Sequence, residues 1–223
     1  MNGPPVDRER GLLEGFAQGW VGVAGARDVL GRGAEFLRQH CFGNQGSGVG
    51  ANDVDAEHHA VVDDVVKVFV GVRGPFSILL HSPKLAARLL PLVTFNREDN
   101  VVEPKLRSVA ILSAVREREA AYVWAAQVGA ARRAGVREEV IDLIRAKGDP
   151  AKLSDEERDI VTYVRQLMRT NRVDQAVFDR LKNRHDAQWM VELTEVANYF
   201  AFLSGMVNPF EVPAPPDGDK LPG

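Results

Sequence analysis

Cysteine, net charge and long apolar runs are all scarce in this chain. Its 223 residues include one cysteine, Cys41, so neither an internal disulfide nor a CxxC redox pair can form. The formal net charge is -3 at pH 7, which argues against a polyanion-binding surface and hence against a nucleic-acid partner. No apolar run approaches the roughly 18 residues needed to span a bilayer. We therefore expect neither a nucleic-acid partner nor a membrane span.

Targeting and cofactor signals are missing as well. Residues 1–10 contain no apolar h-region of the kind found in secretory signals, so with a single cysteine a cytoplasmic location is the simplest expectation. The sequence shows no Cys/His cluster at ligand spacing, no HExxH and no glycine-rich phosphate loop after a strand. We predict that the protein needs no metal and no organic cofactor.

Helical periodicity dominates what is present. A valine-rich segment could be mistaken for a strand, but its apolar residues fall at helical spacing: Val61, Val62, Val65, Val66 and Phe69. A capping box at 154–157 opens another helix. The other predicted helices are 76–81, 83–94, 104–118, 120–134, 137–147, 174–184 and 187–206. No segment reads convincingly as a strand, so the predicted fold class is all-α.

Composition divides the chain into three parts. Residues 1–53 form a helical extension that is interrupted by glycines and ends in a Gly-rich loop. Residues 54–210 form the helical domain. Residues 211–223 are a Pro/Gly-rich tail, which we expect to be mobile or to lie on a neighbouring copy.

The order of several motifs resembles a known family. They are Gly74–Pro83, Leu106–Leu112, Tyr122–Gly135, Leu153–Arg158 and Tyr199–Phe210. Together they are similar to the carboxymuconolactone decarboxylase family, which implies an AhpD-like helical bundle over roughly residues 70–210. The chain departs from the family's Glu-Trp-x-x-His pattern, because Val123 and Gln127 replace the Glu and the His around Trp124. It also lacks the CxxC pair of the peroxidase branch.

Two residues are candidates for catalysis. Gln127 stands at the position of the family's histidine; an amide does not titrate near pH 7, but it can donate a hydrogen bond to a substrate oxygen. His81 precedes a predicted helix start and has the titration range for proton transfer. The alternatives are a satisfied polar residue inside a helix bundle for Gln127 and a packing or capping histidine for His81.

Substrate binding is predicted at five further positions: Arg97, Arg107, Tyr122, Trp124 and Tyr199. Arginine suits bidentate carboxylate binding, although a surface or intersubunit salt bridge is the alternative for either one. The phenols could donate hydrogen bonds, and all three aromatic residues could instead be core packing residues.

Two classes of function remain open. The resemblance implies a cofactor-free lyase, isomerase or hydratase acting on a small carboxylated or carbonyl compound in a catabolic pathway. The alternative is a non-catalytic binding or assembly protein that kept the fold. A pocket where Gln127, His81 and an arginine converge would favour the enzyme, whereas a pocket plugged by Phe95, Phe200 or Phe202 would favour the alternative.

A homo-oligomer based on dimers or trimers is also expected. The resemblance implies it, and the predicted helix 187–206 is apolar nearly all round. Such a helix must be covered on all sides by its own chain or by a neighbour.

Overall fold

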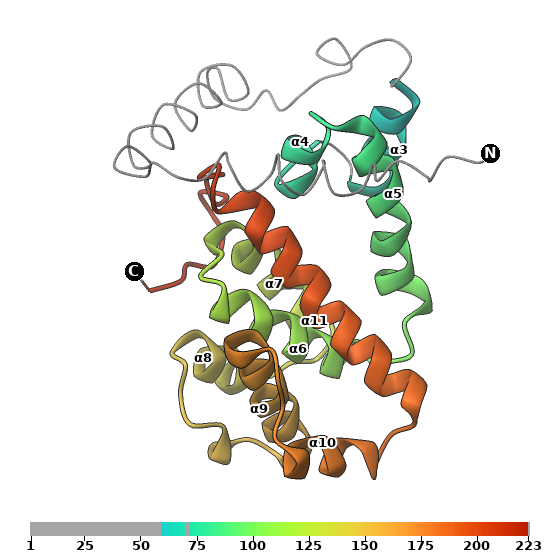
Figure 1. The fold of residues 1–223 in the computed structure, drawn as a ribbon. Coiled ribbons are helices and arrows are strands. Elements are labelled where there is room, and N and C mark those ends of the chain that lie inside the picture. The colour runs from blue at the N-terminus through green and yellow to red at the C-terminus, as the bar shows by residue number, and fades with distance from the viewer. Residues whose placement is uncertain (1–58, 70–71, 223) are drawn as a thin grey trace, which may run out of the picture. The chain divides into compact units, whose positions relative to one another are not determined.

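The structure is a computed structural model that describes residues 59–69 and 72–222. This part of the chain is helical and contains no strand, which confirms the all-α prediction for it (Figure 1). The predicted extension 1–53, with Cys41, lies outside the described residues. All residues discussed below belong to one compact unit, Asn44–Gly223.

The helices follow the predicted segments closely. They are α3 (His59–Phe69), α4 (Pro75–Leu79), α5 (Pro83–Thr94), α6 (Pro104–Glu117), α7 (Ala121–Arg133), α8 (Glu138–Arg145), α9 (Asp155–Thr170), α10 (Gln175–Lys182) and α11 (Ala187–Val207). A π-helical turn, η4 (Phe95–Asp99), follows α5, and a 3-10 turn, η5 (Pro150–Lys152), precedes α9. Neither turn was predicted, and η4 contributes to the pocket described below.

Most of the predicted helix ends are confirmed at the level of side chains. Ser154 and Glu157 form the predicted capping box at the start of α9. Asp186 accepts a hydrogen bond from the Trp189 amide at 2.8 Å and so caps α11. Gly135 follows α7 with a φ of 86°, a conformation that glycine adopts without strain. Ser82 does precede α5, but its side chain makes no capping hydrogen bond.

The larger apolar core gathers around α6 and α11. These two helices pack against each other, α6 also contacts α7, α8 and α9, and α11 also contacts α7, α9 and α10. The largest fully buried side chains of this cluster are Leu112, Trp124, Ile141, Ile144, Ile160, Leu181 and Leu193. Each such side chain contributes about 1.5–3 kcal/mol to stability.

A second apolar cluster joins α3, α4 and α5 to the far part of α11. Val65, Phe76, Leu79 and Leu80 are almost completely buried there. Tyr199 of α11 belongs to this cluster, whereas Leu193, earlier on the same helix, belongs to the larger core. The single helix α11 therefore ties the two clusters together.

The C-terminal tail lies on its own chain rather than projecting from it. Val212 and Leu221 pack against the larger core, and Asp219 forms ion pairs with Arg132 of α7 and Arg145 of α8. An acidic residue of the tail thus meets two cations on the helix surface, and the expectation of a mobile tail stays a prediction.

Candidate functional site

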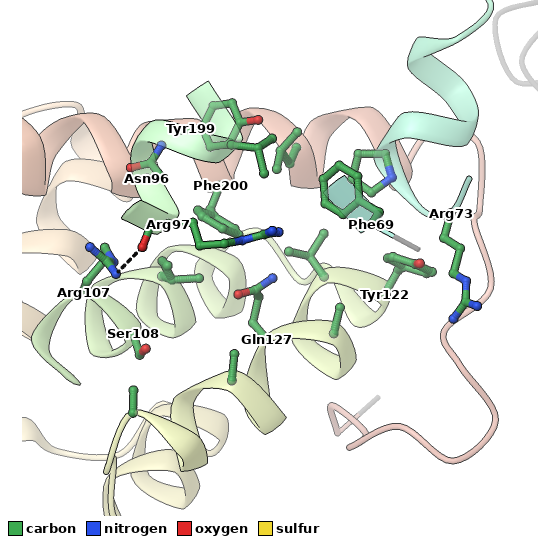
Figure 2. Close-up of a pocket in the computed structure, with 18 of the residues that line it drawn as sticks. Phe69, Arg73, Asn96, Arg97, Arg107, Ser108, Tyr122, Gln127, Tyr199 and Phe200 are labelled. Atoms are coloured by element: carbon green, nitrogen blue, oxygen red, sulfur yellow. Dashed lines mark hydrogen bonds between the residues drawn. The ribbon is translucent and has the colours of Figure 1, made fainter. Parts of the chain in front are cut away.

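A cavity of about 680 Å³ lies where the two apolar clusters meet. Its wall is built from α3, α4, α5, η4, α6, α7, α11 and the C-terminal tail. Phe76 supplies apolar surface, as do Tyr199 and Phe200 (Figure 2). A volume of this size suits a small organic molecule.

The charges around the cavity are all of one sign. Arg73, Arg97, Arg107 and Arg133 line it, and no Asp or Glu of the described chain does. Within that part of the chain, none of these arginines pairs with a carboxylate. The cavity is therefore cationic in a chain whose net charge is negative.

Arg107 is held by backbone oxygens instead. Its guanidinium donates to the carbonyls of Asn100 at 3.2 Å, Val102 at 3.3 Å and Arg97 at 3.4 Å. Burial lowers the pKa of this half-buried guanidinium, although an arginine stays protonated in proteins. Carbonyl dipoles fix its position without cancelling its charge.

Arg97 projects from the π turn into the cavity (Figure 2). Its Nη1 donates to the Val68 carbonyl at 3.2 Å, and its guanidinium carbon lies 5.9 Å from the centre of the Phe69 ring. The Phe69 ring and the carbonyl hold the side chain, yet leave most of its donors for a ligand.

The π turn is what brings Asn96 and Arg97 to the cavity together. The Asn100 amide donates to the Phe95 carbonyl five residues earlier, at 3.0 Å, so one extra residue is inserted into the helical turn. Such π-helical turns occur often at functional sites. Pro91 lies just before the turn, inside α5, and removes a helical donor.

Two carboxylates on α11 hold this segment in place. Glu192 Oε2 accepts from the Val101 amide at 2.7 Å, and Glu195 Oε1 accepts from Asn96 Nδ2 at 3.2 Å. Asn96 Oδ1 in turn accepts from Asn100 Nδ2 at 3.1 Å. The wall that carries Arg97 is thus fastened to α11 by side-chain hydrogen bonds rather than by apolar packing alone.

Glu195 is a carboxyl group behind the wall with an unsatisfied oxygen. Its Oε2 is buried without a partner. Burial raises its pKa, the hydrogen bond from Asn96 acts in the opposite direction, and the charge of Glu192 raises it further, so that the net shift is upward. A carboxyl group in this state can hold a proton above its ordinary titration range.

Tyr199 lies one helical turn after Glu195. Its hydroxyl group is buried and has no partner. Burial and the Glu195 charge both raise its pKa, so the phenol stays protonated at neutral pH. A buried hydroxyl without a partner calls for a water or ligand atom.

The floor of the cavity is one face of α7. Tyr122, Val123, Ala126, Gln127 and Ala130 share this face. Gln127 is half-buried and its amide points into the cavity (Figure 2). The structure shows no hydrogen bond from that amide to any described residue, so both its donor and its acceptor are available to a ligand.

Gly74 makes room for the Tyr122 ring. A Cβ at position 74 would lie 2.2 Å from Tyr122 Cε1, and the φ of Gly74 is 53°. Both the space and the left-handed backbone require glycine here. Burial raises the pKa of the Tyr122 hydroxyl, and the Arg73 charge lowers it by less.

The structure brings five of the predicted site residues to one cavity: Arg97, Arg107, Tyr122, Gln127 and Tyr199. Their predicted roles remain predictions. Phe200 lines the cavity without filling it, Phe95 borders a separate groove, and Phe202 is 40% exposed.

His81 and Trp124 are not brought to the cavity. His81 is exposed after α4, because Leu79 and Leu80 turn that segment's apolar side inward. Trp124 falls on the core face of α7 with Val128 and is fully buried; the Arg145 guanidinium lies 5.7 Å from its ring centre. Geometry gives neither residue the predicted contact with a substrate.

Sequence reasoning missed five polar residues of this site: Arg73, Asn96, Ser108, Arg133 and Glu195. The two acids Glu192 and Glu195 in an otherwise uncharged helix were a usable signal, because a buried acid needs a reason to be there. The position of Asn96 could not be foreseen without the π turn.

Comparison with known proteins adds no relative. No model of a known protein family matches the chain, and no curated protein matches it significantly. The carboxymuconolactone decarboxylase resemblance thus stays a prediction, and the function must be argued from the cavity itself.

Residues 59–69 and 72–222 contain no group of three or more His, Cys, Asp or Glu side chains that could hold a metal ion. No helix in these ranges is both long and apolar enough to cross a membrane.

Proposed function

We propose that the cavity binds a small organic carboxylate with an apolar body, and that the protein is a cofactor-free lyase or isomerase acting on it. One observation carries the proposal: arginines line an otherwise largely apolar cavity, and no carboxylate of the described chain neutralises them. Arg107 is the half-buried member of this set and has no anionic partner among the described residues, and a partly buried cation is stabilised when an anion joins it. Arginine binds carboxylates with two parallel hydrogen bonds.

Each wall has a part in the proposed reaction. Arg97 and Arg107 hold an oxyanion, Gln127 orients a carbonyl oxygen, and the aromatic wall around Phe200 packs against the apolar body. In a decarboxylation the carbon–carboxylate bond breaks, carbon dioxide leaves, and the electron pair moves to an adjacent carbonyl as an enolate. The guanidinium and amide donors would stabilise that enolate oxygen.

A proton must then replace the carboxylate at carbon. Within the described chain, Glu195 is the one carboxyl group hydrogen-bonded to a lining residue, Asn96. Its raised pKa suits an acid that is protonated closer to neutral pH. Glu195 replaces His81 as our candidate proton source. Water in the cavity would carry the proton from Glu195 to the substrate.

A second candidate, a non-catalytic carboxylate-binding protein, rests on a specific observation. The described residues that line the cavity include no His, Cys, Lys, Asp or Glu. Binding needs only the arginines and Gln127, whereas catalysis needs a proton carrier as well.

A mass-spectrometric screen separates the two candidates. Carboxylated lactones and keto acids would be incubated with the protein in D₂O. A lyase gives a product that has lost carbon dioxide and gained deuterium at the same carbon. Arg97→Gln should abolish turnover, whereas Arg88→Gln should not, because Arg88 is an exposed arginine of α5 that donates to the Lys84 carbonyl.

Binding without any product would support the second candidate. If no carboxylate is either bound or converted, both candidates are wrong.

The proposal also includes expectations for the helix arrangement, the location and the oligomeric state. We expect the AhpD-like arrangement of helices, a cytoplasmic location and a homo-oligomer based on dimers or trimers. Val191 and Phe202 of α11 are 67% and 40% exposed, which leaves apolar surface for a neighbour to cover. Light scattering that returned a monomer of 24.5 kDa would contradict the oligomer.

A further inference from the structure

The C-terminal segment forms part of the cavity wall. After α11 ends, the Val212 amide donates to the Val207 carbonyl at 3.2 Å and the chain turns back. Glu211 takes a left-handed φ of 50° at this turn. Pro215 then lines the cavity, and no other described residue of the tail does so.

An ionic anchor fastens the end of this segment. Asp219 Oδ2 accepts from Arg132 Nη1 at 2.6 Å, and Asp219 Oδ1 accepts from Arg132 Nη2 at 3.0 Å and from Arg145 Nη2 at 3.2 Å. The two arginines belong to α7 and α8, so the anchor spans two helices. The Asp219 side chain is 26% exposed, which leaves the anchor open to water and salt.

A close contact between the turn at Gly218 and α7 also holds this segment. The Gly218 amide donates to the Pro215 carbonyl at 2.9 Å, and a Cβ at position 218 would lie 2.6 Å from Ala125 Cβ. Only glycine allows the turn to rest this closely on α7.

Residues 213–222 make few other contacts with the described residues. Prolines at 213, 215, 216 and 222 have no N–H to donate. Of the apolar side chains, Val212 and Leu221 reach the core and are only partly buried. A segment with few buried contacts and few backbone hydrogen bonds opens at a lower free energy than the helices beneath it.

We infer that residues 211–222 act as a strap that closes one wall of the cavity, with the Asp219 anchor as its latch and Pro215 as the residue that limits ligand size. The inference rests on the proposed function in that the ligand is a small organic anion. With the latch closed, a small carboxylate fits, whereas a bulkier aromatic anion is kept out. With the latch open, the cavity admits the larger anion.

The latch can be tested against a matched residue on the same segment. Asp219→Asn removes the charge that holds Arg132 and Arg145, whereas Asp217→Asn changes an exposed acid that makes no ion pair with the described residues. Hydrogen exchange of residues 212–221 would be measured by mass spectrometry in the full chain. Two probes would be titrated: benzoate as the small anion and 8-anilinonaphthalene-1-sulfonate as the large one.

The inference predicts a split between these measurements. In Asp219→Asn, exchange of the segment should rise about tenfold and the large probe should bind several times faster and more tightly, while benzoate affinity changes by less than about twofold. Asp217→Asn should match the wild type. Pro215→Gly should admit the large probe even though the latch is intact.

Each failure has its own signature. Unchanged exchange and unchanged large-probe binding in Asp219→Asn would overturn the strap. Failure of the wild type to bind benzoate would count against the proposed function, and the exchange measurement would still decide whether the latch exists.

Discussion

The arginines that pair with core carboxylates differ from the arginines that line the cavity in the partners they have. In the core, Asp159 is fully buried and accepts from Arg180 and Arg184 at 2.8 Å each. Glu157 and Glu117 are equally enclosed and paired with cations of neighbouring segments. Around the cavity, no carboxylate of the described chain meets an arginine.

The difference separates structural charge from available charge. A buried carboxylate without a compensating partner would destabilise the fold, and for Asp159, Glu157 and Glu117 that partner is a cation. The cavity arginines are held by carbonyls and an aromatic ring instead, as Arg107 and Arg97 show. The fold therefore positions these cations without neutralising their charge.

The largest expected effect comes from breaking a core pair. Asp159→Ala should lower the free energy of unfolding by about 2–4 kcal/mol, less than for a wholly enclosed pair because Arg180 and Arg184 are partly exposed. Urea unfolding followed by circular dichroism measures this. Asp155→Ala, whose side chain is 77% exposed on the same helix, should cost about 1 kcal/mol or less.

A steric change at the cavity wall comes next. Gly74→Ala forces a Cβ into the Tyr122 ring and a strained φ, so it should cost about 1–3 kcal/mol. Gly205→Ala is the control, because its Cβ would meet nothing within 4 Å and alanine favours the helix by about 1 kcal/mol. Equal effects of the two changes in thermal melts would contradict the described wall.

The two kinds of carboxyl group should respond oppositely to pH. For Asp159, burial acts to raise the pKa, but hydrogen bonds from Arg180 and Arg184 outweigh it. Because its folded pKa is depressed, its contribution to stability is present above the unfolded pKa of about 3.9 and is lost as pH falls.

Glu195 has the opposite sign, because burial raises its pKa. Its contribution is present below the unfolded value of about 4.3 and is lost as the pH rises through the folded pKa. Glu195→Gln should therefore be more stable relative to wild type at pH 8 than at pH 4. A constant difference between Glu195→Gln and the wild type across pH would refute the raised pKa of Glu195.

The smallest expected effect on stability concerns the cavity arginines. Arg97→Gln should change the free energy of unfolding by less than about 0.5 kcal/mol, since no described carboxylate loses its partner. Arg180→Gln should cost more, because it removes a donor from buried Asp159. Equal costs in urea unfolding would erase the distinction between the two sets.

The helices could be predicted because their signals are local. The capping box at Ser154 and the cap at Asp186 lie within four residues of the groups they satisfy, and apolar spacing located α3 despite its valines. Gln127 and Arg97 were placed in one site by chemical type and motif order, and the structure does bring them to one cavity.

The remaining site residues depend on long-range geometry. Glu195 meets Asn96 across 99 positions of sequence, and the π turn that aims Asn96 has no local signature in its residues. His81 lies outside the cavity because the orientation of this segment depends on which side of α4 is buried. The ion pairs of the tail were not foreseen, because its Pro/Gly composition does not indicate which acid meets a cation.

Calorimetric titration with benzoate tests the central claim most directly, that the cavity's unpaired arginines are positioned for a carboxylate. The account predicts that the wild type binds benzoate at a single site per chain, that Arg97→Gln weakens binding by at least about tenfold, and that Arg88→Gln leaves it unchanged. Equal benzoate affinity in all three proteins, or no binding to the wild type, would contradict it.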